Sequence, residues 1–327
     1  MTRPPLSLLD LTRVREDQGP AQALRNAATV AGHVESLGFR RYWLAEHHNM
    51  VGVASAATAV VIAHVAAATR SIRVGAGGVM LPNHAPYVIA EQFGTLAQLH
   101  PGRIDLGLGR APGTDGVTMM RALRSDPARG DSFPQDVVEL LGYFAPEDDR
   151  PRIRAVPAPG TDAQVIILGS SHFGALLAAE LGLPYAFASH FAPAALHDAL
   201  ELYRSRFKPS ARLAAPHAIV AANAICAPTE AEARFLFTTT QQGFLGLVRN
   251  NRGYSPPPVE RIDWTRAEEA HVGAMLRCSA IGTPDQVRAG LERIVAETRA
   301  DEVILVSDCH DLDARLRSLR LTARAWT

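Results

Sequence analysis

Short apolar runs alternate along the chain with longer segments in which apolar residues recur every three or four positions. The short runs, many of them β-branched, predict strands at 6–9, 41–45, 72–80, 103–109, 164–168, 185–188, 218–224 and 302–307. The longer segments predict helices at about 20–37, 54–68, 86–99, 133–144, 172–182, 193–207, 229–248, 283–299 and 311–325. Alternation of strands and helices indicates a parallel sheet, and eight strands with a final helix favour a closed (β/α)8 TIM barrel. We therefore predict one α/β domain over 1–327.

Several boundaries have visible causes. Gly38 and Gly182 each follow a predicted helix and suit the left-handed conformation that ends one. Thr283, followed by Pro284 and Asp285, is typical of a helix start. The polar segment 246–270 contains three consecutive prolines, which cannot continue a helix, and predicts an insertion before the last strand. A second long loop is expected at 148–160.

Composition excludes some classes of function. The chain has 327 residues, is 47% hydrophobic and carries 33 Lys+Arg against 33 Asp+Glu, so it can bury a large core but has no excess of positive charge for nucleic acid. The Ala-rich stretch 51–68 contains Ser55, Thr58 and His64, which predicts a packed helix rather than a membrane span. The N-terminus lacks the apolar core of a signal peptide, and the three cysteines are far apart. We expect a cytoplasmic protein that binds neither nucleic acid nor membrane.

Chemistry-bearing residues stand where predicted strands end. Strand 41–45 runs into Glu46-His47-His48, and strand 103–109 ends at Gly109 and Arg110. Ligands of parallel α/β proteins bind at the carboxyl ends of strands, so both endings predict one shared site. Gly169-Ser170-Ser171 lies between a strand and a helix and offers two hydroxyls plus backbone amides, which suit a phosphate. With the Arg110 guanidinium as a bidentate partner, the pattern favours an anionic, planar cofactor.

The ordered set of segments 43–50, 74–84, 90–92, 101–103, 107–110, 168–171 and 281–287 resembles the bacterial luciferase-like, flavin-dependent monooxygenase family. It looks closest to the alkanal-monooxygenase-like subgroup. The resemblance implies a (β/α)8 barrel, reduced FMN (FMNH2) as cosubstrate, molecular oxygen and usually a homodimer. A two-component monooxygenase is then expected, in which a separate flavin reductase supplies FMNH2 and the substrate is a small, aldehyde-like organic molecule.

The resemblance also assigns residues. It implies a non-prolyl cis peptide at Gly77 and Gly78 against the flavin ring, where the missing side chains let the ring approach the backbone. It places Glu46, His47 and His48 beside flavin and substrate. One of these two histidines is expected to donate a proton or a hydrogen bond to the oxygenated flavin, because imidazole titrates near neutral pH.

The remaining residue predictions come from strand geometry. Strand alternation puts Glu46 and His48 on one side and His47 on the other. His190 follows the sixth strand at the barrel end where substrate would bind. Glu91 is expected to be a structural partner of Arg103 or Arg110.

Other readings compete with this one. A metal site at the His47-His48 pair would need further ligands that the spacing does not supply, so no metal is predicted, and a metal-dependent hydrolase ranks last. Hydride transfer with the deazaflavin F420 is the second enzymatic hypothesis, and a non-catalytic flavin-binding barrel is a third. Some light-emitting relatives have a cysteine where this chain has Gly109, so light emission is not implied.

Overall fold

The computed structural model describes residues 3–146 and 153–327. Its strands form one parallel sheet and are β1 (Leu6–Asp10), β2 (Arg41–Leu44), β3 (Arg73–Met80), β4 (Ile104–Gly109), β5 (Gln164–Gly169), β6 (Tyr185–Phe187), β7 (Ala218–Cys226), β8 (Ser279–Gly282) and β9 (Glu302–Val306). The α-helices in these described residues are α1 (Gly19–Ser36), α2 (Thr58–Ala68), α3 (Pro86–Leu99), α4 (Phe133–Tyr143), α5 (His172–Leu181), α6 (Leu196–Arg206), α7 (Glu230–Val248), α8 (Arg266–Met275), α9 (Pro284–Thr298) and α10 (Leu312–Trp326).

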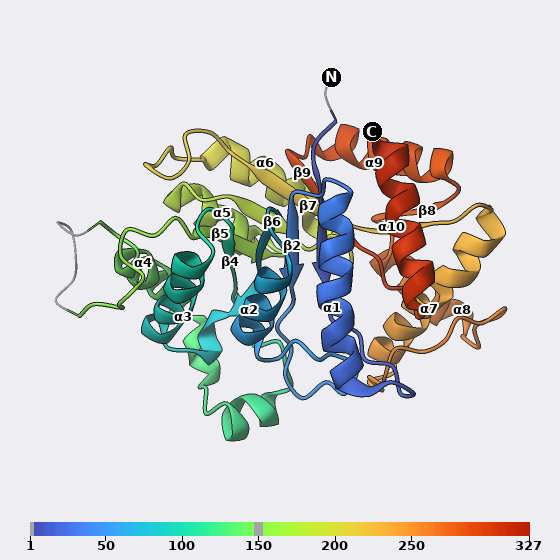
Figure 1. The fold of residues 1–327 in the computed structure, drawn as a ribbon, viewed down its shortest axis with the longest axis horizontal. Coiled ribbons are helices and arrows are strands. Elements are labelled where there is room, and N and C mark those ends of the chain that lie inside the picture. Colours follow the sequence, from blue (N-terminus) through green and yellow to red (C-terminus); the bar gives the residue numbers. More distant parts are fainter. Residues whose placement is uncertain (1–2, 147–152) are drawn as a thin grey trace.

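Eight of the strands close into a ring. β1 pairs with β2 and β9, and β7 pairs with both β6 and β9, so the order around the barrel is β1-β2-β3-β4-β5-β6-β7-β9. Helices surround these strands, and α7 packs beside α8 at one edge of the molecule (Figure 1). The eight strands predicted from the sequence are these eight, and the predicted TIM barrel is confirmed.

Between α7 and α9, in and just after the predicted insertion 246–270, lie two elements that the pattern did not predict. Helix α8 buries only Val272, so it has almost no apolar stripe, and a capping box of Thr265 and Glu268 defines its start instead. Strand β8 has four residues and pairs with the second half of β7, beyond the part of β7 that pairs with β6. The nine-residue length of β7 therefore lets one strand serve both the barrel and the insertion.

The segment 249–265, which joins α7 to α8, lies against the loops at the carboxyl end of the barrel. The Ser255 N–H donates to the Val14 carbonyl at 2.8 Å, and the Ser255 carbonyl lies 3.1 Å from Nδ1 of His310. A Cβ on Gly52 would stand 2.2 Å from the Gly253 carbonyl oxygen, so the two loops touch through their backbones.

The barrel interior has a charged layer below an apolar one. Arg41, Asp105 and Glu302 lie fully buried towards the amino ends of the strands and are joined by ion pairs. Strand alternation turns the next inward side chains, among them Trp43 and Ile304, into an apolar layer above them. The carboxyl end of the barrel opens above this apolar floor.

Local details agree with the sequence at most helix ends. Gly38 and Gly182 have φ angles of 79° and 60°, as their C-terminal positions require, and Thr283 is the N-cap of α9. No helix in the described residues is long and apolar enough to cross a membrane. The predicted loop 148–160 lies partly outside the described residues.

The prediction for Glu91 is wrong. The Arg103 guanidinium donates instead to the Ile72 carbonyl and to the hydroxyl of Thr69, and the Arg110 guanidinium stacks on a ring.

Candidate functional site

A cavity of about 630 Å³ opens at the carboxyl end of the barrel. Its size is typical of small-molecule sites, and most of its wall is apolar. The predicted site residues in its wall are His47, Gly77, Gly78, Arg110, Gly169, Ser170, Ser171 and His190. Glu46 and His48, which were also predicted at the site, are not part of this wall.

One end of the cavity has the features of an anion site. Arg110 at the end of β4 lines the same cavity as Ser170 and Ser171, which follow β5. Ser171 is the N-cap of α5, and its side chain makes no capping hydrogen bond, so hydroxyl and first-turn amides remain available. The Arg110 guanidinium lies 4.4 Å from the ring centre of Phe173, which holds it over the helix start.

The wall beside this end is bare backbone. The Gly77-Gly78 peptide is cis, as the family resemblance implies, and the register between β3 and β4 shifts at this point. A Cβ on Gly77 would stand 2.8 Å from a methyl carbon of Leu9, and one on Gly78 would stand 2.7 Å from the Gly107 carbonyl oxygen. Side chains are therefore excluded at both positions, and a flat ligand can approach the backbone closely.

His47 faces the cavity with a defined tautomer. Its Nδ1 lies 3.3 Å from the Gly113 carbonyl, which can only accept, so Nδ1 carries the proton of the neutral ring. Nε2 is then the free acceptor. Burial lowers the pKa of His47 below its ordinary value, against the opposing effect of the Gly113 carbonyl. His47 is thus a neutral base near pH 7 rather than a ready proton donor.

Glu46, His48 and His84 form a separate cluster next to the cavity. Nε2 of His48 and Nε2 of His84 donate to the same carboxylate oxygen of Glu46, at 2.9 and 2.8 Å. Burial opposes the charge of Glu46, but the two hydrogen bonds outweigh it and hold the pKa of the carboxyl below its ordinary value. As strand alternation predicted, Glu46 and His48 lie on the same side and His47 on the other.

His84 ends a segment that carries the family resemblance, but its bond to Glu46 was not predicted from the sequence, because His84 follows β3 and is far from Glu46 along the chain. The three ligand atoms lie within 4.8 Å of one another, and such a set is chemically suited to a metal ion. Here the two imidazoles already satisfy the carboxylate, and the cluster ties the loop after β2 to the loop after β3.

His190 lies in the cavity wall after β6. It is 8% exposed, and its Nδ1 is buried without a hydrogen-bond partner among the described residues. Burial lowers the pKa of His190 to about 4, although Asp308 acts in the opposite direction. The imidazole is therefore neutral at physiological pH. Its backbone carbonyl accepts a hydrogen bond of 2.8 Å from the side chain of Asn223.

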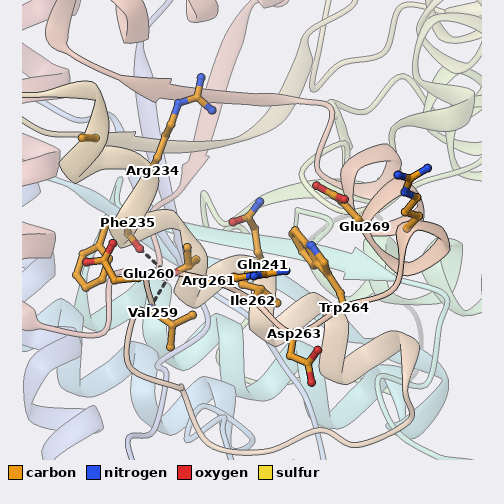
Figure 2. A pocket seen from close by; sticks show the side chains of 13 residues that line it. Arg234, Phe235, Gln241, Val259, Glu260, Arg261, Ile262, Asp263, Trp264 and Glu269 are labelled. Atoms are coloured by element: carbon orange, nitrogen blue, oxygen red, sulfur yellow. Dashed lines mark hydrogen bonds between the residues drawn. The ribbon is translucent and has the colours of Figure 1, made fainter.

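A second hollow, of about 750 Å³, lies outside the barrel between α7 and the residues 259–269 (Figure 2). Its wall contains exposed guanidinium and carboxylate groups, including Arg234 and Glu269, and the side chain of Trp264. None of the predicted site residues lies there, and charges of both signs fit no single class of ligand. The barrel cavity is the better candidate.

Comparison with known proteins agrees with this geometry. The family model described as luciferase-like monooxygenase matches residues 5–302. A relative named luciferase-like monooxygenase, from Escherichia coli (strain K12), is 51% identical over 317 residues, which are 96% of this chain and 95% of that protein. This chain belongs to the luciferase-like monooxygenase family, a family of oxidoreductases.

Solved structures share the fold. Apo-MsnO8 superposes with a TM-score of 0.87 at 32% identity, covering 99% of this chain and 98% of that one. The oxygenating constituent of 3,6-diketocamphane monooxygenase from Pseudomonas putida, solved in complex with FMN, has a TM-score of 0.73 at 17% identity over 99% and 97% of the two chains. An F420-dependent secondary alcohol dehydrogenase has a TM-score of 0.71 at 16% identity over 100% of both chains. At these lower identities the likeness shows the fold alone.

Proposed function

We propose that this chain is the oxygenating component of a two-component, FMN-dependent monooxygenase. A separate flavin reductase supplies FMNH2, and the substrate is a small organic molecule of aldehyde-like character. The observation that carries the proposal is the convergence of Arg110, Ser170 and Ser171 on one cavity whose adjoining wall is the Gly77-Gly78 backbone. Such a cavity presents donors for a phosphate at one end and a flat, side-chain-free surface beside it.

The described residues fit an FMN molecule in that orientation. The phosphate dianion would accept hydrogen bonds from the Arg110 guanidinium, from the two serine hydroxyls and from the first amides of α5. The ring would lie against Gly77 and Gly78, which line the cavity with backbone and no side chain. When bound in reduced form, FMN supplies the two electrons with which O2 delivers one oxygen atom to the substrate and the other to water.

The chain's own residues then control protons and water. Nε2 of His47 accepts a proton or a hydrogen bond, since Nδ1 is committed to Gly113. Of the two histidines considered catalytic from the sequence, His47 is the one proposed here, because His48 is bound to Glu46 outside the cavity wall. The apolar floor, including Trp43, keeps bulk water from the reacting atoms.

The proposal extends to assembly and location. Exposed apolar side chains on α2 and α3, including Val60 at 70% and Leu99 at 65% exposure, support a homodimer through these helices. Sedimentation velocity tests that part. The three free cysteines support a reducing, cytoplasmic location.

Titration of the protein with FMN, followed by flavin fluorescence, tests the cofactor assignment. We expect Arg110→Ala to weaken FMN binding by about 10- to 150-fold, the equivalent of losing one charge-assisted interaction of about 1.5–3 kcal/mol. Arg121→Ala is the matched control, because Arg121 is an exposed arginine of the neighbouring segment that does not line the cavity. Equal affinities for wild type and Arg110→Ala would refute the phosphate site.

The same titration separates the alternatives. Tighter binding of F420 than of FMN would replace the monooxygenase proposal with F420-dependent hydride transfer. FMN binding without substrate-dependent oxygen uptake, in the presence of FMNH2 and a panel of aldehydes, would favour a non-catalytic flavin-binding barrel.

A further inference from the structure

The cavity continues past the phosphate donors: β6 pairs with β5, so His190 after β6 stands between the serines after β5 and the wall formed by β7, β9 and β1. In the closed ring β6 stands four strands from β2, so His190 after β6 and His47 after β2 lie on opposite sides of the mouth. The wall between β6 and β1 is made of small and aliphatic side chains, Ala186, Ala221 and Ile304 among them. Among the described lining residues of this part of the wall, His190 is the one with a polar side chain.

The imidazole of His190 lacks the partners that a buried polar ring needs. Nδ1 is buried and unpaired, and no hydrogen bond joins either ring nitrogen to another described residue. The ring contacts Phe191 edge-to-face at a centroid distance of 4.9 Å, which fixes its orientation but satisfies neither nitrogen. Nδ1 is closed off from the cavity, whereas Nε2 is not among the buried atoms, so Nε2 is the ring nitrogen that a ligand or water can reach and bond to.

The other hydrogen-bonding side chains of the wall are already engaged or lie at the phosphate end. An Asp126 carboxylate oxygen accepts from the Ala128 N–H at 2.9 Å, and Nδ1 of His47 is bonded to the backbone. Arg110 is a cation of the wall, but it stands beside Ser170 and Ser171. Among the described residues that line the cavity, none from β6 round to β1 is charged, and Asp308 and Arg13, which act electrostatically on His190, are paired with each other at 2.9 Å.

We propose that His190 determines substrate specificity, and that the substrate is an uncharged molecule with one oxygen hydrogen-bonded to the His190 imidazole. The apolar remainder of the substrate lies against Trp43 and Ile304, and it enters past Phe173 and Phe191, which line the cavity and are 37% and 39% exposed. The inference rests on the proposed function in taking this part of the cavity as the substrate end. The neutral state of His190, whose pKa burial lowers to about 4, agrees with an uncharged partner.

Equilibrium binding tests the proposal without turnover. The ligands are methyl butyl ketone, its alkene isostere in which CH2 replaces the carbonyl oxygen, and hexanoate. Binding is followed by the tryptophan fluorescence of Trp43, the one tryptophan in the described cavity wall. Ketone and alkene are titrated with and without oxidised FMN, and hexanoate is titrated against the FMN-loaded protein, in which the phosphate end is occupied.

We expect wild-type protein to bind the ketone about 3- to 10-fold more tightly than the alkene, and hexanoate at least about 10-fold more weakly than the ketone. His190→Leu should bring the ketone-to-alkene ratio to about 1. His190→Gln, which keeps a donor and an acceptor, should retain part of the preference. Ile304→Ala is the apolar control: Ile304 lines the cavity without a hydrogen-bonding group, so its loss should change the affinities for ketone and alkene by the same factor.

An unchanged ratio in His190→Leu, or tighter binding of hexanoate than of the ketone, overturns the proposal. If His190→Leu does not fold, the ratio in His190→Gln decides: a ketone-to-alkene ratio below that of wild type supports the role of His190, and an unchanged ratio overturns it. The FMN titration of the same samples is an independent readout. If wild-type protein does not bind FMN, the proposed function is wrong. The ketone-to-alkene affinity ratio measured without FMN would still decide the role of His190.

Discussion

The buried ion cluster below the cavity gives a sharp prediction about what holds the barrel together. Arg41 is 1% exposed, and its Nε lies 2.9 and 3.1 Å from the two carboxylate oxygens of Glu302. Its Nη1 lies 2.9 Å from Asp105 and 2.7 Å from the side-chain oxygen of Gln164. One guanidinium therefore joins β2, β4, β5 and β9 across the barrel axis.

Arg41→Met keeps the length of the side chain and removes its charge and donors. Two carboxylates with no exposed surface then lose their central cation, and we expect the free energy of unfolding to fall by about 3–5 kcal/mol. The matched control is Arg40→Met. Arg40 is adjacent and also faces Glu302, but at 3.6 Å and with 44% of its side chain exposed, so its loss should cost less than about 1 kcal/mol.

Urea unfolding followed by far-ultraviolet circular dichroism measures both variants against wild type. The pH dependence provides a second check. Burial opposes the charge of Glu302, but His217 and Arg41 outweigh it and hold the pKa of this carboxyl below its ordinary value. A carboxyl whose pKa is lower in the folded than in the unfolded state stabilises the folded protein at pH values above its unfolded pKa of about 4.3. This stabilisation is lost as the pH falls through the folded-state pKa. The difference in free energy of unfolding between wild type and Arg41→Met should therefore be largest above about pH 5 and should decrease in acid. A loss below about 1 kcal/mol, or equal losses for Arg41→Met and Arg40→Met, would refute the reasoning.

Two further substitutions test the walls of the site. Gly78→Ala sets a methyl group 2.7 Å from the Gly107 carbonyl oxygen, so the free energy of unfolding should fall by about 1–3 kcal/mol. FMN binding should also weaken in the fluorescence titration, and wild-type behaviour in both assays would contradict this prediction. Glu46→Gln exchanges a charged acceptor of His48 and His84 for a neutral one, and should cost about 1–2 kcal/mol at pH 7. Because the pKa of Glu46 is lowered in the folded protein, its contribution to stability should be lost as the pH falls below about 4.5. Thermal unfolding of wild type and Glu46→Gln should therefore become similar in acid. A difference that stays constant with pH would count against the cluster.

The sequence predicted the barrel well because its eight strands are short, apolar and separated by periodic helices. It did not predict α8 or β8. Helix α8 owes its stability to the cap at Thr265 and to contact with α7, so it shows almost no apolar period, and β8 is too short to give a pattern. Helix α2 begins at Thr58 rather than 54, since the Ser55 hydroxyl is bonded to the Ala45 carbonyl and Thr58 to the Ser55 carbonyl.

Site residues that stand at strand ends could be found from the pattern, because the barrel gathers all carboxyl ends at one mouth. Arg110 and Ser170 are examples, and both line the cavity. Contacts between loops could not be found in this way. The bond from His84 to Glu46 joins two loops whose paths depend on tertiary packing, and the tautomer of His47 depends on a carbonyl in a third loop. The binding roles of these residues remain predictions.

The attachment of the insertion to β7 has a consequence for engineering and for divergence among relatives. Segment 249–265 leaves α7, which packs on the barrel, and returns to α8 and then to β8, which is hydrogen-bonded to β7, so both of its ends are fixed. A stretch with anchored ends is a natural grafting position: residues can be swapped there without shifting the register of the ring beneath. Chimeras that exchange this stretch should change which molecules gain access to the mouth while the scaffold stays intact.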